Sequence, residues 1–232
     1  MLTWHNETLN IYTHLIPGLY WLWKAVTVIP SGSPEHQFLI YAANGGAATM
    51  GITSGLAHLL HIEKGWATFS WKMDYLGILA INYAHFLLDT FLLTKGIWHS
   101  DSLCILGFFL QTVAALICVR RIVVSDLEIG RFWAFAYPAV TVPFTLAIYC
   151  VRGYDSVFPV VQDSIQASLN CSIFITIAGV VFFKGGFPER YYNPGGVFDK
   201  FGSHTWHHIF IVCSIVAGFK CLPNLYLLES RE

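Results

Sequence analysis

Residues 102–119 read SLCILGFFLQTVAALICV, and no charged side chain interrupts this stretch. A helix of about 20 apolar residues is long enough to cross the roughly 30 Å hydrocarbon core of a bilayer. Similar apolar stretches occur along the rest of the chain, near residues 8–29, 36–60, 74–94, 132–151, 160–183 and 204–222. Together these stretches predict an all-α protein, a bundle of seven transmembrane helices.

The composition supports a single membrane domain. Hydrophobic residues make up 55% of the 232 residues and charged residues only 12%, whereas a soluble domain carries about 25% charged residues. The loops between the apolar stretches are too short to separate domains, so residues 1–232 are expected to form one seven-helix membrane domain. The net charge of −1 argues against a nucleic-acid partner. None of the six cysteines belongs to a C-x-x-C pair, which argues against a thiolate zinc motif.

The distribution of basic residues predicts an orientation in the membrane. Lys and Arg are more frequent at the N-terminal side, which holds the loops after the second, fourth and sixth apolar stretches. Cytoplasmic loops carry an excess of these residues. We therefore expect a multi-pass protein of the plasma membrane or the endoplasmic reticulum, with its N-terminus in the cytosol and its C-terminus outside or in a lumen.

Three histidines lie at the cytosolic ends of two of these stretches. His58 is near the end of the second stretch, and His204 and His208 open the seventh. His204 and His208 are four residues apart, so they share one face of a helix. Ionisable side chains in a membrane segment are costly and usually functional, and neutral imidazole is the commonest protein ligand for zinc. Three imidazoles and a water form an open tetrahedral site, so the sequence predicts zinc bound by His58, His204 and His208.

Two more polar residues are expected at the same depth. Ser54 precedes His58 by four residues on the same helix face, and Asp74 is expected to open the third helix. Zinc lowers the pKa of a bound water to about 7 and polarises a carbonyl group. Asp74 is placed to take the proton from that water, and Ser54 is placed to orient the water or the substrate. The alternative is a structural zinc that joins helices without chemistry.

The first apolar stretch has a polar face of its own. Glu7, Asn10 and His14 follow at i, i+3 and i+7, which is one face of a helix. A single intramembrane histidine is more often a hydrogen-bonded packing group than a ligand, and this is the interpretation for His14. His207 points about 100° away from the adjacent His208 on a helix, so we expect His207 to be a bystander that does not bind the metal.

Three motifs resemble those of the progestin and adipoQ receptor family, which includes the adiponectin receptors and the haemolysin III-related proteins. Residues 5–14, HNETLNIYTH, are similar to the family's first-helix motif H-x-E-T-x-N-I-x-T-H. Ser54-x-x-x-His58, followed by KMDYLGI at 72–78, resembles the second motif. PER at 188–190, FD at 198–199 and SHTWHHIF at 203–210 together resemble the third motif of the family. The resemblance spans essentially the whole chain, and the chain is similar to fungal members.

The resemblance implies a fold and a site. It implies seven transmembrane helices with a cytosolic N-terminus, and a zinc held by His58, His204 and His208, with Asp74 and Ser54 beside the bound water. Family members usually carry a polar N-terminal region before the first motif. Because this sequence begins almost on that motif, the N-terminal cytosolic region is expected to be missing.

The resemblance also implies two possible activities. One is zinc-dependent lipid hydrolysis of the ceramidase kind, and the other is a receptor role. Fungal members are linked to lipid, sterol and zinc homeostasis. The expected partners are membrane lipids, either a ceramide-like substrate or a sterol, and an extracellular or lumenal ligand. The favoured interpretation is a hydrolase that cleaves an amide lipid such as ceramide. The alternative is a signalling receptor or regulator in which the zinc is purely structural.

Overall fold

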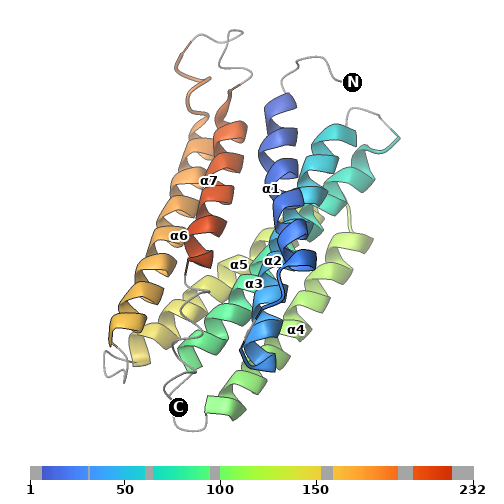
Figure 1. The fold of residues 1–232 in the computed structure, drawn as a ribbon. Coiled ribbons are helices and arrows are strands. Elements are labelled where there is room, and N and C mark those ends of the chain that lie inside the picture. The colour runs from blue at the N-terminus through green and yellow to red at the C-terminus, as the bar shows by residue number, and fades with distance from the viewer. Residues whose placement is uncertain are drawn as a thin grey trace.

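The computed structural model describes residues 7–30, 32–60, 65–94, 100–152, 159–192 and 201–220, and the regular elements in these ranges are all α-helices. In chain order the helices are α1 Thr8–Thr27, α2 Pro34–Leu60, α3 Ala67–Thr94, α4 Ser100–Val124, α5 Leu127–Arg152, α6 Pro159–Gly185 and α7 Ser203–Phe219. Figure 1 shows α6 and α7 running side by side at one edge of the bundle. The predicted all-α fold with seven helices is therefore confirmed for the described part of the chain.

Several helices extend beyond the apolar stretches that predicted them. α3 begins at Ala67, α4 continues to Val124, and α5 begins at Leu127. Polar residues such as Lys72 take part in these additional turns, because the hydrogen bonds of a helix join backbone groups and do not require apolar side chains. Asp74 therefore lies inside α3 and does not open it, which corrects the sequence-based expectation.

Two buried apolar clusters hold the helices together. One cluster joins α3, α4 and α5 and consists of Tyr75, Leu79, Cys118, Ile122, Ala134 and Tyr137. The other joins α1, α2, α3 and α7 and consists of Trp21, Ala47, Ala48, Met50, Ile81 and Ile215. The second cluster anchors α7 against the first three helices. The beginning of α1, the end of α2 and the beginning of α7 lie at the same end of the bundle (Figure 1).

The outward faces of the helices carry large apolar side chains. On α4, Ile105 is 68% exposed, and Phe109 and Leu116 are each 63% exposed. Extended apolar surface of this kind is typical of contact with a membrane or another protein. Among the described residues, Cys104–Val124 is the one stretch long and apolar enough to cross a membrane by length and composition, and Asn170–Gly185 is a shorter apolar stretch. That the remaining helices also cross the membrane stays a prediction.

α1 and α2 approach each other at glycine. The spacing G-x-x-x-G at Gly51 and Gly55 is typical of close helix contact, and α1 is the helix they contact. A methyl group on Gly51 would lie 2.6 Å from the Cα of Gly18 and 2.7 Å from the carbonyl oxygen of His14, and one on Gly55 would lie 2.8 Å from the Cβ of Leu15. The absence of these side chains brings the first turns of α1 close to the end of α2.

Gly51→Ala is expected to lower the midpoint of thermal unfolding in detergent. The atoms that the new methyl group would meet belong to the α1 backbone, and overpacking of this kind costs about 1–3 kcal/mol. Gly45→Ala is the matched control, because it lies on the same helix and its methyl group would meet nothing within 4 Å. Alanine is also the better helix former, so Gly45→Ala should be neutral or slightly stabilising. Equal midpoints for the two variants would contradict the packing assigned to Gly51.

Candidate metal centre

The structure brings the three histidines predicted as metal ligands together. His58 lies in the last turn of α2, and His204 and His208 lie in the first two turns of α7. One ring nitrogen of each histidine lies within 4.8 Å of one ring nitrogen of each of the other two. His58 is 1% exposed and His208 is 4% exposed, while His204 is partly exposed. We refer to these residues as the histidine cluster, and its geometry could hold one metal ion.

The chemistry of the histidine cluster fits a metal of the zinc type. Within the described part of the chain, Nδ1 of His208 is buried and has no hydrogen-bond partner. A buried polar atom in that state costs about 1–3 kcal/mol, and ligation of a metal ion would remove the cost. Three imidazoles with a fourth position left for water are a donor set of catalytic zinc sites.

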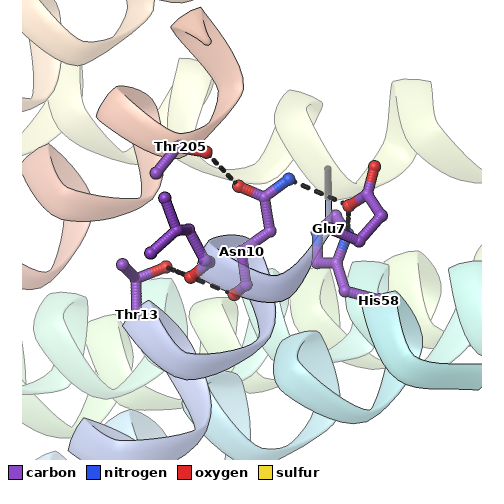
Figure 2. A network of polar contacts seen from close by, with 6 residues as sticks. Glu7, Asn10, Thr13, His58 and Thr205 are labelled. Carbon is purple, nitrogen blue, oxygen red and sulfur yellow. Dashed lines mark hydrogen bonds and ion pairs between the residues drawn. The ribbon is translucent and has the colours of Figure 1, made fainter. Parts of the chain in front are cut away.

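A carboxylate immediately before α1 holds the ring of His58. Oε2 of Glu7 lies 2.8 Å from Nδ1 of His58 and accepts a hydrogen bond from Nδ2 of Asn10 at 2.9 Å. Oδ1 of Asn10 accepts a hydrogen bond from Oγ1 of Thr205 at 2.6 Å. Figure 2 shows this chain of contacts, which runs from α2 through α1 to α7. We call it the α1 relay; its members are His58, Glu7, Asn10 and Thr205.

Glu7 carries a negative charge at neutral pH. It is the residue immediately before α1, outside the helix itself. Partial burial raises the pKa of its carboxyl group. The hydrogen bonds from His58 and Asn10 lower this pKa by more than burial raises it, and the resulting pKa is about 2. An ionised carboxylate only accepts hydrogen bonds. Nδ1 of His58 is therefore the donor, and in the neutral form of this ring the lone pair is on Nε2.

The predicted catalytic pair lies next to the histidine cluster. Ser54 is buried one turn before His58 in α2, and a side-chain hydrogen bond joins it to Asp74 of α3. The carboxyl group of Asp74 also lies within electrostatic range of His58. The structure thus places the acid, the hydroxyl group and the first of the three histidines side by side.

Two other histidines lie near the cluster in different settings. The ring of His14 on α1 is buried, and its centroid lies 3.8 Å from that of His208. His14 therefore packs directly against the candidate ligand His208. His207 stacks on Phe183 of α6, with centroids 5.3 Å apart and ring planes at 28°. His207 thus faces α6, in agreement with the role of a bystander.

A second carboxylate fixes the beginning of α7. Glu189, from the loop after α6, accepts one hydrogen bond from the backbone N–H of Ser203 at 2.6 Å and another from the Ser203 hydroxyl group. The first N–H groups of a helix have no partner within the helix. Because Ser203 immediately precedes His204, this cap determines where the helical turn that carries the first candidate ligand of α7 begins.

Sequence reasoning assigned no role to Glu7, Asn10, Thr205 or Glu189. The spacing of Glu7, Asn10 and His14 revealed a polar face on α1, but spacing along one helix does not show which helix that face contacts. No signal in the sequence pointed to Thr205, because a single threonine in a helical stretch is common.

Comparison with known proteins identifies the family. Residues 2–219 match the family described as haemolysin-III related. The chain is 23% identical over 240 residues to membrane progestin receptor alpha of Sus scrofa, with 98% of this chain and 67% of the relative covered. It is 25% identical over 280 residues to heptahelical transmembrane protein 3 of Arabidopsis thaliana, with 98% and 77% covered.

A fungal relative is also similar. The chain is 28% identical over 252 residues to the ADIPOR-like receptor IZH1 of Eremothecium gossypii, with 98% of this chain and 74% of the relative covered. The family match extends over nearly the whole chain and includes all the residues of the histidine cluster and the α1 relay. This chain belongs to the haemolysin-III-related family of receptor-like membrane proteins.

Proposed function

We propose that this protein is a zinc-dependent membrane hydrolase that cleaves an amide lipid such as ceramide. The observation that carries the proposal is the convergence of three histidines from two helices within 4.8 Å, next to a hydrogen-bonded Asp74–Ser54 pair. A purely structural zinc site closes all four positions with protein ligands. An open site with an acid and a hydroxyl group beside it suits chemistry better.

Each residue has a definite task in this proposal. His58, His204 and His208 hold the metal. A zinc ion bound there would polarise the carbonyl group of the substrate and lower the pKa of a bound water to near 7. Asp74 accepts the proton of the attacking water and delivers it to the leaving amine nitrogen, as a general base that then acts as a general acid. Ser54 holds the Asp74 carboxyl group in place through their hydrogen bond.

The setting of the site supports a lipid substrate. The helices around it carry large exposed apolar side chains, and an apolar surface of this kind suits contact with the acyl chains of lipids. The excess of basic residues on the side that holds the N-terminus and the histidine cluster supports a cytosolic N-terminus. The protein would lie in the plasma membrane or the endoplasmic reticulum. The products, a fatty acid and a sphingoid base, would connect the protein to lipid, sterol and zinc homeostasis.

A second function is supported by the relatives. Membrane progestin receptor alpha and the ADIPOR-like receptor IZH1 are receptors by name. In this alternative the zinc joins α2 to α7 and stabilises the fold without chemistry. A sterol, or a ligand on the extracellular or lumenal side, would then act by shifting these helices.

One pair of measurements on the same sample tests the proposal. The detergent-purified protein should contain about one zinc per chain and should release fatty acid from ceramide. Zinc without hydrolysis of ceramide or other amide lipids would favour the receptor alternative. A protein that binds no zinc would refute both functions, because both require the metal.

A further inference from the structure

The polar face of α1 has no part in ligating the metal or in the proposed chemistry, yet all three of its residues contact the parts of the chain that carry the ligands. The geometry points to a positioning role: Glu7, Asn10 and His14 form an outer shell that fixes the rings of His58 and His208 and ties α7 to α2. This inference rests on the proposed metal site. It goes further by assigning the first helix to the control of metal affinity.

Glu7 selects the nitrogen that His58 presents. Its carboxylate lies 2.8 Å from Nδ1 and is the acceptor of that hydrogen bond. The proton of the neutral imidazole is therefore on Nδ1, and Nε2 is the nitrogen that can donate to a metal. Carboxylate–histidine contacts of this kind fix the tautomer and the ring orientation of metal ligands and make the ligand more basic.

Asn10 transmits this arrangement to α7. Both ends of its side-chain amide are used, because Nδ2 donates to Glu7 at 2.9 Å and Oδ1 accepts from Thr205 at 2.6 Å. Thr205 follows His204 directly and precedes His208 by less than one turn. The bond to Thr205 therefore limits the rotation of α7 about its axis, and this rotation sets where both α7 ligands point.

His14 completes the contact on the other side of the cluster. Its ring lies 3.8 Å from the ring of His208, measured between centroids, and both side chains are buried. A buried ring at this distance restricts the side-chain rotation of His208. The close approach of α1 and α2 at Gly18 and Gly51 brings α1 near enough for these contacts to form.

The relay predicts a weaker metal site when α1 is disconnected from α7. Thr205→Val keeps the shape of the side chain and removes the hydroxyl group that donates to Asn10. We expect zinc affinity, measured by competition with a chromophoric chelator in detergent, to fall several-fold. Glu7→Gln removes the charged acceptor of His58 and should weaken zinc binding about 10–100-fold, the range found for outer-shell partners of metal ligands.

Thr13→Val is the matched control. Among the described residues, the hydroxyl group of Thr13 (Figure 2) bonds to carbonyl oxygens of its own helix, that of Leu9 at 2.7 Å and that of Asn10 at 3.2 Å. Its zinc affinity should equal that of the wild type. The unfolding midpoint of each variant with the metal removed by EDTA separates loss of the relay from general damage to the fold.

The double variant Glu7→Gln/Thr205→Val tests whether the contacts act as one unit. In a connected relay, the second substitution should weaken zinc binding less than it does alone. Additive losses, or wild-type affinity in both single variants, would overturn the positioning role while leaving the metal site intact. A wild-type protein that binds no zinc would instead refute the metal site itself, and the positioning role with it.

Discussion

Asp74→Asn is expected to abolish hydrolysis of ceramide while the protein keeps its zinc. The carboxyl group of Asp74 bonds to Ser54 and lies near His58, but it is not one of the three clustered ligands. An asparagine preserves the shape and the bond to Ser54, but it cannot accept the proton of the attacking water. Loss of a general base lowers the rate by about 100- to 10,000-fold, so the fall in turnover should reach at least that range.

Asp126→Asn is the matched control for this variant. Asp126 lies at the turn between α4 and α5, where its Oδ1 accepts the backbone N–H of Ile129. Asparagine caps a helix about as well as aspartate, so turnover, zinc content and unfolding midpoint should all stay at the wild-type level. A substantial residual activity in Asp74→Asn, with zinc retained, would show that Asp74 is not the base.

His208→Ala is expected to remove the zinc. This residue is buried, its ring is within 4.8 Å centroid distance of both other members of the histidine cluster, and its Nδ1 has no hydrogen-bond partner among the described residues. Two imidazoles that remain cannot complete the site, so zinc per chain should fall to near zero after dialysis. The stabilisation that zinc gives to the wild type by binding the folded state should disappear as well.

His207→Ala provides the control for loss of an imidazole from the same turn. Its ring stacks on Phe183 and faces α6, so this variant should retain its zinc even if its unfolding midpoint is lower. Zinc content measured on both purified variants decides the assignment. Equal zinc content in His208→Ala and the wild type would show that the histidine cluster is not the metal site.

The amino-acid sequence was sufficient to predict the helices and the position of the cluster along the chain. Apolar stretches identify helices, and His58, Ser54 and His204 could be placed at one end of the bundle because alternating helices reverse direction. Hydropathy could not place the beginning of α3, because the turns before Asp74 contain polar residues whose backbones are helical all the same. Helix ends depend on backbone hydrogen bonding, which apolar patterns do not report.

The partners of the polar residues could not be predicted in the same way. The contact between Glu7 and His58 joins residues 51 positions apart, and that between Asn10 and Thr205 joins residues 195 positions apart. These contacts depend on how closely α1 packs against α2 and α7. That packing follows from the small residues Gly18 and Gly51, and a helix pattern alone does not show which pair of glycines meets.

The order of the helices has a consequence for the biosynthesis of the protein. The candidate ligands come from α2 and from α7, the last helix in the part of the chain that the structure describes. A ribosome makes the chain from its N-terminus, so His58 is present long before His204 and His208. The complete histidine cluster can form only after α7 has joined the bundle. If the histidine cluster holds a metal as proposed, loading in the cell is therefore a late event, and a chain that stops before α7 should be delivered to the membrane without metal.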